Sequence, residues 1–294
     1  MTLATLLPLV LRLSIAGTVL AVGLRTRRED VMYVFRDSAR FARSMGAMIV
    51  VMPLLALALA AVLDLHPAVK VALVGLAVSP VPPMLPRKEM KAGGRGSYAV
   101  GLLFATALLS IVTVPLAVHL VGEALDAPRS LTAMAVGSVV LATVIGPLAL
   151  GVVIRTFAPS FADRASHPVG LVSTVLLAAG AVPVLAAMWR PMLSLVGNGT
   201  VLAIVVFALV GLATGHLLGG PDPQDRVVLA LSTAARHPMV AITAAMALYP
   251  GHRDVAPAVL LYLLVSAVVS AVYIRLASRP SATAGRARTV PRAL

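Results

Sequence analysis

The chain has 294 residues, of which 60% are hydrophobic and 12% are charged, and its mean hydropathy is +0.98. Ordinary soluble domains carry about 25% charged residues, so this composition excludes that class and indicates a polytopic membrane protein. The net charge of +13 does not indicate nucleic-acid binding, because the basic residues lie between apolar runs instead of on one aromatic-rich face. The absence of cysteine excludes disulfides and thiolate metal sites.

Apolar windows of about 20 residues, the length that crosses a bilayer as a helix, predict nine transmembrane helices. The runs are too long, and alternate too little, for the strands of a membrane barrel, so the fold is predicted to be all-α. The first run is too long for the core of a signal peptide and is expected to be a retained span. The spans are expected at residues 3–24, 43–63, 67–92, 97–121, 131–154, 168–189, 198–218, 227–249 and 255–277.

The distribution of lysine and arginine predicts the orientation in the membrane. With the N-terminus outside, 18 of the 24 basic residues lie on the inner side, as the positive-inside rule requires. We therefore expect a multi-pass protein of the cell inner (plasma) membrane, with a cytoplasmic C-terminus. Residues 279–294 are expected to form a disordered basic cytoplasmic tail. The exceptions are four residues on the outer side, Lys70, Arg129, Arg190 and Arg253, and two within spans, Arg12 and Arg236.

Two of the spans are interrupted by proline, which removes a backbone donor and clashes with the preceding helical turn. The third span meets Pro80, Pro82, Pro83 and Pro86, and the eighth meets Pro238 directly after Arg236 and His237. An arginine at the centre of a membrane helix costs about 2.5–3.5 kcal/mol on insertion scales, so it is seldom present without a function. Elsewhere, Gly211 and Gly215 form a GxxxG pattern that predicts close helix packing.

The two interrupted spans occupy corresponding positions, each between two continuous spans, and they run in opposite directions. Paired, proline-interrupted segments of this kind indicate an inverted-repeat transporter whose solute binds near the breaks. The alternative is that proline merely kinks both helices. The candidate substrate-binding residues are Ser79, Pro80, Arg87, Lys88, Glu89, Ser232, Thr233, Arg236, His237 and Pro238; no catalytic residue and no metal ligand is predicted.

Several of these side chains have two interpretations. Arg236 could clamp a carboxylate with two hydrogen bonds, or it could cap backbone carbonyls at the helix break. His237 could relay protons or could be a packed, hydrogen-bonded residue. Arg87 and Lys88 could line an inward-facing cavity for anions or could be ordinary inner-loop charges. Glu89 is the one acid near a break, and it could pair with Arg236 or carry a coupling proton.

A series of short motifs, in order along nearly the whole chain, resembles the bile acid:sodium symporter family, in particular a divergent bacterial member. The motifs are Val22-Gly23-Leu24, Glu29-Asp30, Met52-Pro53-Leu54, Ser79-Pro80, residues 91–94, residues 110–115 and residues 232–238. The resemblance implies one transmembrane transporter unit, residues 1–278, in which two broken helices cross. It implies a core domain at 43–121 and 198–277 and a panel domain at 3–24 and 131–189.

The chain departs from the family at the sodium site that the resemblance implies. There the family has a glutamate and a glutamine four residues apart, followed by an asparagine, whereas this chain has Ser232, Arg236 and His237. Sodium, a hard cation, needs oxygen ligands, and a guanidinium in their place repels it. The sequence therefore disfavours sodium coupling; no cofactor is expected, and a role for sodium stays open.

The predicted function is secondary transport of an organic anion, bile-acid-like or a small carboxylate, by alternating access. The alternatives are a sodium-coupled symporter of the same fold and a non-transporting membrane sensor or scaffold. An enzyme is not expected, because the sequence offers no Ser-His-Asp set, metal cluster or phosphate loop. The expected partners are the lipid bilayer and a small organic anion, without nucleic acid, and the oligomeric state stays open.

Overall fold

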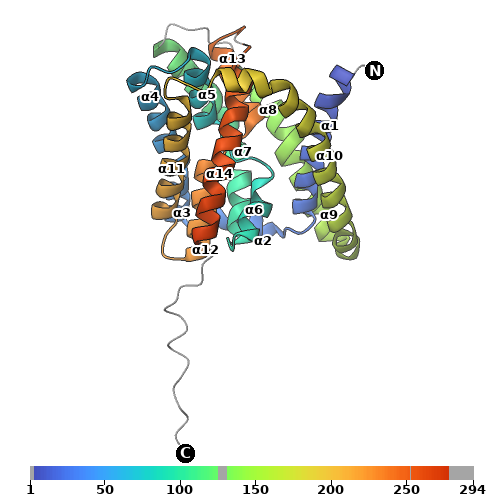
Figure 1. Cartoon of the computed structure of the whole chain (residues 1–294). Coiled ribbons are helices and arrows are strands. Elements are labelled where there is room, and N and C mark those ends of the chain that lie inside the picture. Colours follow the sequence, from blue (N-terminus) through green and yellow to red (C-terminus); the bar gives the residue numbers. More distant parts are fainter. Residues whose placement is uncertain (1–2, 125–130, 252, 278–294) are drawn as a thin grey trace, which may run out of the picture.

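The computed structural model describes residues 3–124, 131–251 and 253–277. Their regular secondary structure is helical, with no strand among them, which confirms the all-α fold class (Figure 1). The predicted tail, 279–294, lies outside the described residues. The elements are α1 (Leu3–Gly23), α2 (Arg28–Val31), η1 (Tyr33–Arg36), α3 (Ser38–Met45), η2 (Gly46–Val51), α4 (Met52–Val62), α5 (Pro67–Val78), α6 (Leu85–Lys91), α7 (Gly96–Ala124), α8 (Ala133–Val140), η3 (Leu141–Ile145), α9 (Gly146–Phe157), α10 (Pro159–Ser194), α11 (Thr200–Leu218), α12 (Pro223–Ala234), α13 (Pro238–Leu248) and α14 (Val255–Ala277).

Among the described residues, seven helical stretches are long and apolar enough to cross a membrane, so this is a multi-pass membrane protein. Two further apolar helices, Leu9–Gly23 and Pro67–Val78, are shorter. The predicted count of nine spans therefore stays a prediction. The seven stretches are Ser38–Val62, Gly96–Glu123, Ala133–Phe157, Pro159–Ser194, Thr200–Leu218, Pro223–Leu248 and Val255–Ala277.

Both expected helix breaks are present. Helix α5 ends at Val78 and the chain continues in an extended conformation at Ser79, with a ψ angle of 149°. Helix α12 ends at Ala234, and Ala235 is likewise extended, with a ψ angle of 142°. Proline then occupies the first turn of the next helix, in α6 and again in α13, where its missing N–H leaves no helical hydrogen bond unmade.

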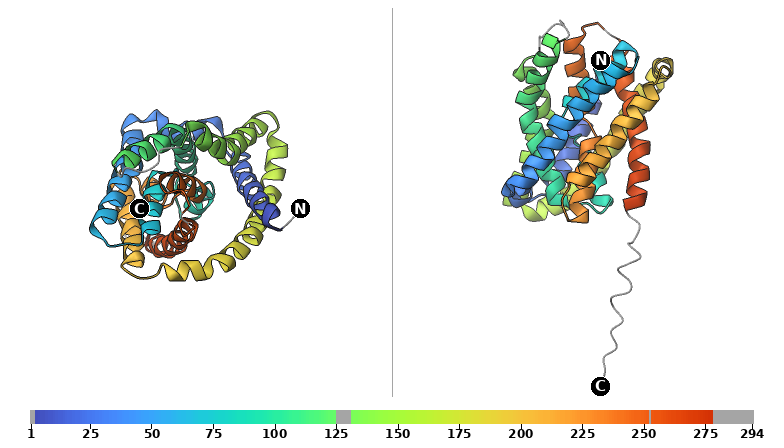
Figure 2. Two further views of the ribbon diagram at one scale, coloured as in Figure 1. Left: turned by 90° about the horizontal axis from the view of Figure 1, so that it is seen from above. Right: turned by 90° about the vertical axis from the view of Figure 1, so that its left-hand side faces the viewer.

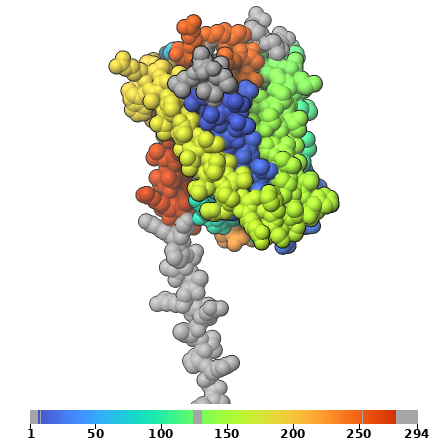
Figure 3. Space-filling model, turned by 90° about the vertical axis from the view of Figure 1, so that its right-hand side faces the viewer, coloured from blue at the N-terminus to red at the C-terminus, as the bar shows by residue number. Residues whose placement is uncertain are grey.

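The helices form two groups. Helix α1 packs against α9 and α10, and these three lie together at one side of the molecule in two views (Figures 1 and 2). On the other side, α5 packs against α4, α13 and α14, and α11 packs against α12 and α14. Figure 3 shows α10 crossing the outer face diagonally with α1 beside it. Helix α10 has 36 residues, well beyond the predicted 168–189, because Pro168, Pro183 and Pro191 do not end it.

Close packing between α11 and α12 depends on a row of glycines on α11. A Cβ atom added to Gly215 would lie 2.3 Å from the carbonyl oxygen of Leu229, and one added to Gly211 would lie 3.1 Å from the Cα of Ala234. A backbone carbonyl cannot move aside as a flexible side chain can. The GxxxG pattern thus positions α12, and with it the second break, against α11.

The variant Gly215→Ala is expected to lower the stability of the protein by about 1–3 kcal/mol, because the new methyl group must push α12 away. A suitable control is Gly137→Ala on α8, where an added Cβ meets only Ile111 Cγ2 at 3.7 Å, an ordinary contact. Thermal unfolding of the purified variants in detergent measures the difference. Equal melting temperatures for the two variants would contradict the packing argument.

Candidate functional site

The two helix breaks meet in the buried interior of the protein, where Arg236 contacts Ser79 although 157 residues separate them along the chain. The backbone N–H of His237 donates a hydrogen bond of 2.9 Å to the carbonyl of Pro80. The approach is possible because Gly75 has no side chain: a Cβ there would lie 2.5 Å from the carbonyl oxygen of Ala241. We call the segments 79–83 and 235–237, with the helix ends beside them, the crossing.

Arg236 lies inside the crossing and is only 1% exposed. Its Nη1 donates to the carbonyl of Ser79 at 3.2 Å, while its Nε and Nη2 have no hydrogen-bond acceptor among the described residues. No described carboxylate lies within ion-pair distance of it. The C-terminal end of a helix carries about half a negative charge. Since α5 ends at Val78 and α12 ends at Ala234, both helix ends favour a cation at this position.

Other side chains satisfy the polar groups that the broken helices leave free. The hydroxyl of Tyr262, on α14, donates to the carbonyl of Ala234, the last residue of α12. The N–H of Val81 donates to Thr106 Oγ1, on α7, at 3.3 Å. In a lipid environment an unpaired backbone group costs several kcal/mol, so these contacts make the crossing possible.

His237 caps the helix that follows it. Its buried Nδ1 accepts a long hydrogen bond of 3.5 Å from the N–H of Val240 in the first turn of α13, which starts at Pro238. This contact agrees with the packed, hydrogen-bonded interpretation. Its Nε2 has no partner among the described residues, and the proton-relay role stays a prediction.

Glu89 and Ser232 form a third polar contact between the two broken spans. Ser232 Oγ, on α12, donates to Glu89 Oε1, on α6, at 2.6 Å, and both residues are fully buried. Glu89 therefore contacts Ser232, and no ion pair joins it to Arg236. The neighbouring Thr233 hydroxyl donates to the carbonyl of Leu229 in its own helix, at 2.7 Å.

Arg87 and Lys88 are directed away from the crossing. Arg87 Nη1 donates to the carbonyl of Gly170 at 3.3 Å and to Thr174 Oγ1 at 3.2 Å, both on α10. Lys88 is exposed. Of the ten residues predicted for one site, eight lie at the crossing or on the helices that adjoin it. The other two, Arg87 and Lys88, lie on other faces of α6.

A cavity of about 300 Å³ lies between α1, α6, α7 and the first half of α10. Arg87 lines it, and Arg25 lines it from the segment after α1, with its Nε donating to Ser166 Oγ at 3.1 Å. The sequence reasoning missed Arg25 and Ser166, because an arginine in an inner loop has no distinguishing pattern. The polar lining residues are Arg25, Thr26, Asp30, Arg87, Ser97 and Ser166.

A second cavity beside Arg236 measures only about 20 Å³. Hydroxyl-bearing residues line it, among them Ser79, Thr106, Ser110 and Thr113. A volume of about 10–15 Å³ on this scale holds a single water molecule. In this conformation the crossing has no room for an organic anion, whereas the larger cavity has.

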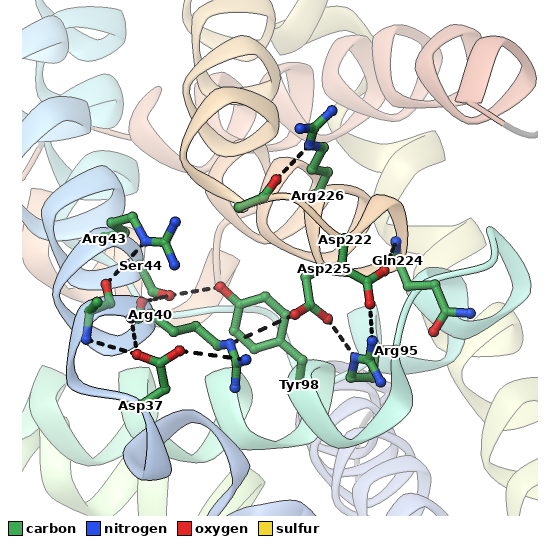
Figure 4. Close-up of polar contacts among 12 residues, drawn as sticks. Asp37, Arg40, Arg43, Ser44, Arg95, Tyr98, Asp222, Gln224, Asp225 and Arg226 are labelled. Carbon is green, nitrogen blue, oxygen red and sulfur yellow. Dashed lines mark hydrogen bonds and ion pairs between the residues drawn. The ribbon is translucent and has the colours of Figure 1, made fainter.

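Charged residues join helix ends on the side of the molecule at which α14 ends (Figures 1 and 4). Asp225, in the first turn of α12, accepts from Arg95 Nε at 2.7 Å and lies 3.7 Å from Arg40 Nε. Arg95 also pairs with Asp222, and the hydrogen bond to Asp225 raises the pKa of Arg95. The guanidinium of Arg40 lies 4.4 Å from the centre of the Tyr33 ring. This cluster holds together α3, the start of α7 and the start of α12.

The variant Asp225→Asn is expected to destabilise the protein by about 1–3 kcal/mol, because it leaves two cations without their shared carboxylate. The side chain of Asp225 is only 7% exposed. The control is Asp163→Asn, whose carboxylate is 67% exposed in a pair with Arg155 and should contribute at most about 1 kcal/mol. Thermal unfolding in detergent compares them, and an effect of Asp225→Asn no larger than that of the control would refute the role of the cluster.

Comparison with known proteins gives one family. A sequence model described as the sodium bile acid symporter family matches residues 13–195, more than half of the chain. The matched region contains most of α1, the first break, α6 and all of α10, and it ends before α11 and the second break. No curated protein sequence matches the chain significantly.

Proposed function

Because the chain belongs to the sodium bile acid symporter family, whose members are secondary transporters, we propose that it carries an organic anion across the membrane by alternating access. The observation that carries this proposal is the 300 Å³ cavity with two arginine side chains at its wall. Guanidinium groups bind carboxylates through paired, charge-assisted hydrogen bonds. The substrate is accordingly bile-acid-like or a small carboxylate.

The cavity suits such a solute in size and chemistry. Its volume is at the lower end of the about 300–1,000 Å³ found for small-molecule sites. Arg25 and Arg87 supply positive charge, and the hydroxyls of Thr26, Ser97 and Ser166 supply further hydrogen-bonding groups. Apolar residues such as Val22 and Val100 complete the wall for the hydrocarbon part of the solute.

The arrangement of the helices supports the proposed mechanism. The seven long stretches and two shorter apolar helices correspond to the nine proposed spans. The first break lies between the preceding helix α4 and the following helix α7, and the second lies between α11 and α14. An inverted repeat requires such a correspondence. We propose that α1, the continuous stretch from α8 through η3 to α9, and α10 form the panel. The cavity lies at the boundary of this panel with α6 and α7 of the core, and it opens to alternate sides. The proposed orientation in the plasma membrane has the N-terminus outside.

We propose that the residues of the crossing form the inner part of the site. Arg236 and His237 carry nitrogen atoms that no described protein atom contacts through a hydrogen bond. The guanidinium of Arg236 occupies the position between two helix C-termini at which a mobile cation would otherwise be favoured. A built-in cation makes a bound sodium ion unnecessary there and repels it.

Uptake by proteoliposomes tests the substrate site, with radiolabelled cholate and radiolabelled pyruvate as probes. The variants Arg25→Gln and Arg87→Gln are each expected to lower uptake by about tenfold or more, because each removes charge-assisted hydrogen bonds of about 1.5–3 kcal/mol. Matched controls are Arg27→Gln and Lys91→Gln, exposed cations that do not line the cavity. Loss of uptake in the controls as well, or in none of the variants, would refute this site.

Arg236→Ala tests the built-in cation and separates a carrier from a scaffold. We expect uptake by the wild-type protein to be insensitive to an imposed sodium gradient, and we expect Arg236→Ala to lose at least tenfold in uptake while it elutes as a monodisperse protein. Robust sodium-driven uptake by the wild type would contradict the role assigned to Arg236. Loss of folding in Arg236→Ala, together with no uptake by the wild type, would favour a scaffold.

A further inference from the structure

Glu89 is a buried acid between α6 and α12, to which the proposed function assigns no role of its own. It is 0% exposed, and its Oε1 accepts from Ser232 Oγ at 2.6 Å. Its Oε2 is buried too and has no hydrogen-bond donor among the described residues. The carboxylate thus has a single neutral partner.

None of the charged side chains on the elements packed against α6 forms a described ion pair with Glu89. The elements packed against α6 include α7 and α12. Arg236 donates to Ser79, Asp225 is paired with Arg95, and Arg226 Nε donates to the carbonyl of Gly220. No ion pair among the described residues includes Glu89. The other titratable side chains of these segments are Tyr98, His119 and Glu123 on α7, His237 after α12, and Arg87, Lys88 and Lys91 on α6 itself.

An ionised carboxylate in this position would be a buried charge without a counter-ion, which is strongly unfavourable. A bound proton removes that cost and needs no additional space. A sodium ion would need several oxygen ligands and a volume to occupy. Glu89 lines neither the 300 Å³ cavity nor the 20 Å³ cavity, and its Oε1 already faces a hydroxyl donor. The surroundings of Glu89 thus favour a proton over sodium.

Helix α6 connects this acid to the cavity. It has only seven residues, and it carries Arg87 toward α10 and the cavity, and Glu89 toward α12. It is followed by Gly93, with a φ angle of +88°, and by Gly94, where an added Cβ would lie 2.7 Å from Val228 Cγ2 on α12. A displacement of α6 that takes Arg87 away from Gly170 therefore also changes the contact of Glu89 with Ser232.

We propose that Glu89 is the proton-binding site of this transporter and that Ser232 holds its protonated carboxyl group in the conformation described. The proposal rests on the proposed function, because the proton crosses the membrane together with the anion. One proton enters with one monovalent carboxylate, so each transport cycle moves no net charge. The proton leaves when α6 moves and the carboxylate meets water.

A spectroscopic test needs no substrate and is therefore independent of the transport hypothesis. Infrared difference spectra of the full-length protein in detergent, titrated across neutral pH, report the C=O stretch of protonated carboxyl groups. We expect a protonated carboxyl band in the wild type that is absent in Glu89→Gln and present in Glu123→Gln, whose acid is 62% exposed on α7. A spectrum of Glu89→Gln identical to that of the wild type overturns the proposal.

Transport measurements then test coupling, again with labelled cholate and pyruvate. Glu89→Gln is expected to lose at least tenfold in uptake driven by an inward proton gradient, yet to retain exchange of labelled for unlabelled substrate. Glu123→Gln should keep both activities. Proton-driven accumulation that survives in Glu89→Gln overturns the proposal, and so does a sodium-driven accumulation that depends on Glu89. If neither the wild type nor any variant takes up either probe, the proposed function is refuted. In that case the infrared band decides whether Glu89 holds a proton.

Discussion

The backbone hydrogen bond from His237 to Pro80, with the contact of Arg236 to Ser79 beside it, is the interaction on which the rest of the structure depends. Two helices that stop inside a bilayer expose carbonyl and N–H groups that lipid cannot satisfy. Here each break satisfies part of the other, and Tyr262 and Thr106 complete the pairing from α14 and α7. The glycines that allow α5 to approach α13 and α11 to approach α12 serve the same contact.

Arg236 changes what such a crossing can do. Two helix C-termini converge on a place where their dipoles favour positive charge. A guanidinium attached to the chain supplies that charge permanently, so it cannot be loaded on one side of the membrane and released on the other. Any coupling to a gradient then needs another mobile charge. We propose the buried Glu89 for that task, because it lies on the short helix that also carries Arg87 to the cavity.

Much of the fold was predictable from local chemistry. Long apolar runs without alternation predict membrane helices, and Pro80 and Pro238 predict breaks because proline removes a backbone donor and clashes with the preceding helical turn. Proline alone does not decide where a helix ends, since α10 continues through three prolines. The positions of α6 and of the cavity could not be predicted from the sequence in the same way. Arg25 and Arg87 both follow the positive-inside pattern, which places cations on one side of the membrane without telling a lipid-facing arginine from one that lines a cavity. The pairing of Glu89 with Ser232, 143 residues away, had no local signal.

The sequence by itself determined the class of protein and the location of both helix breaks. These features depend on hydrophobicity, backbone sterics and residue identity, which act over a few positions. The tertiary structure decided which polar groups meet: Arg236 with Ser79, Glu89 with Ser232, and Arg25 and Arg87 across one cavity. Those contacts join distant segments, and they follow from helix packing, where a single glycine determines how closely two backbones approach.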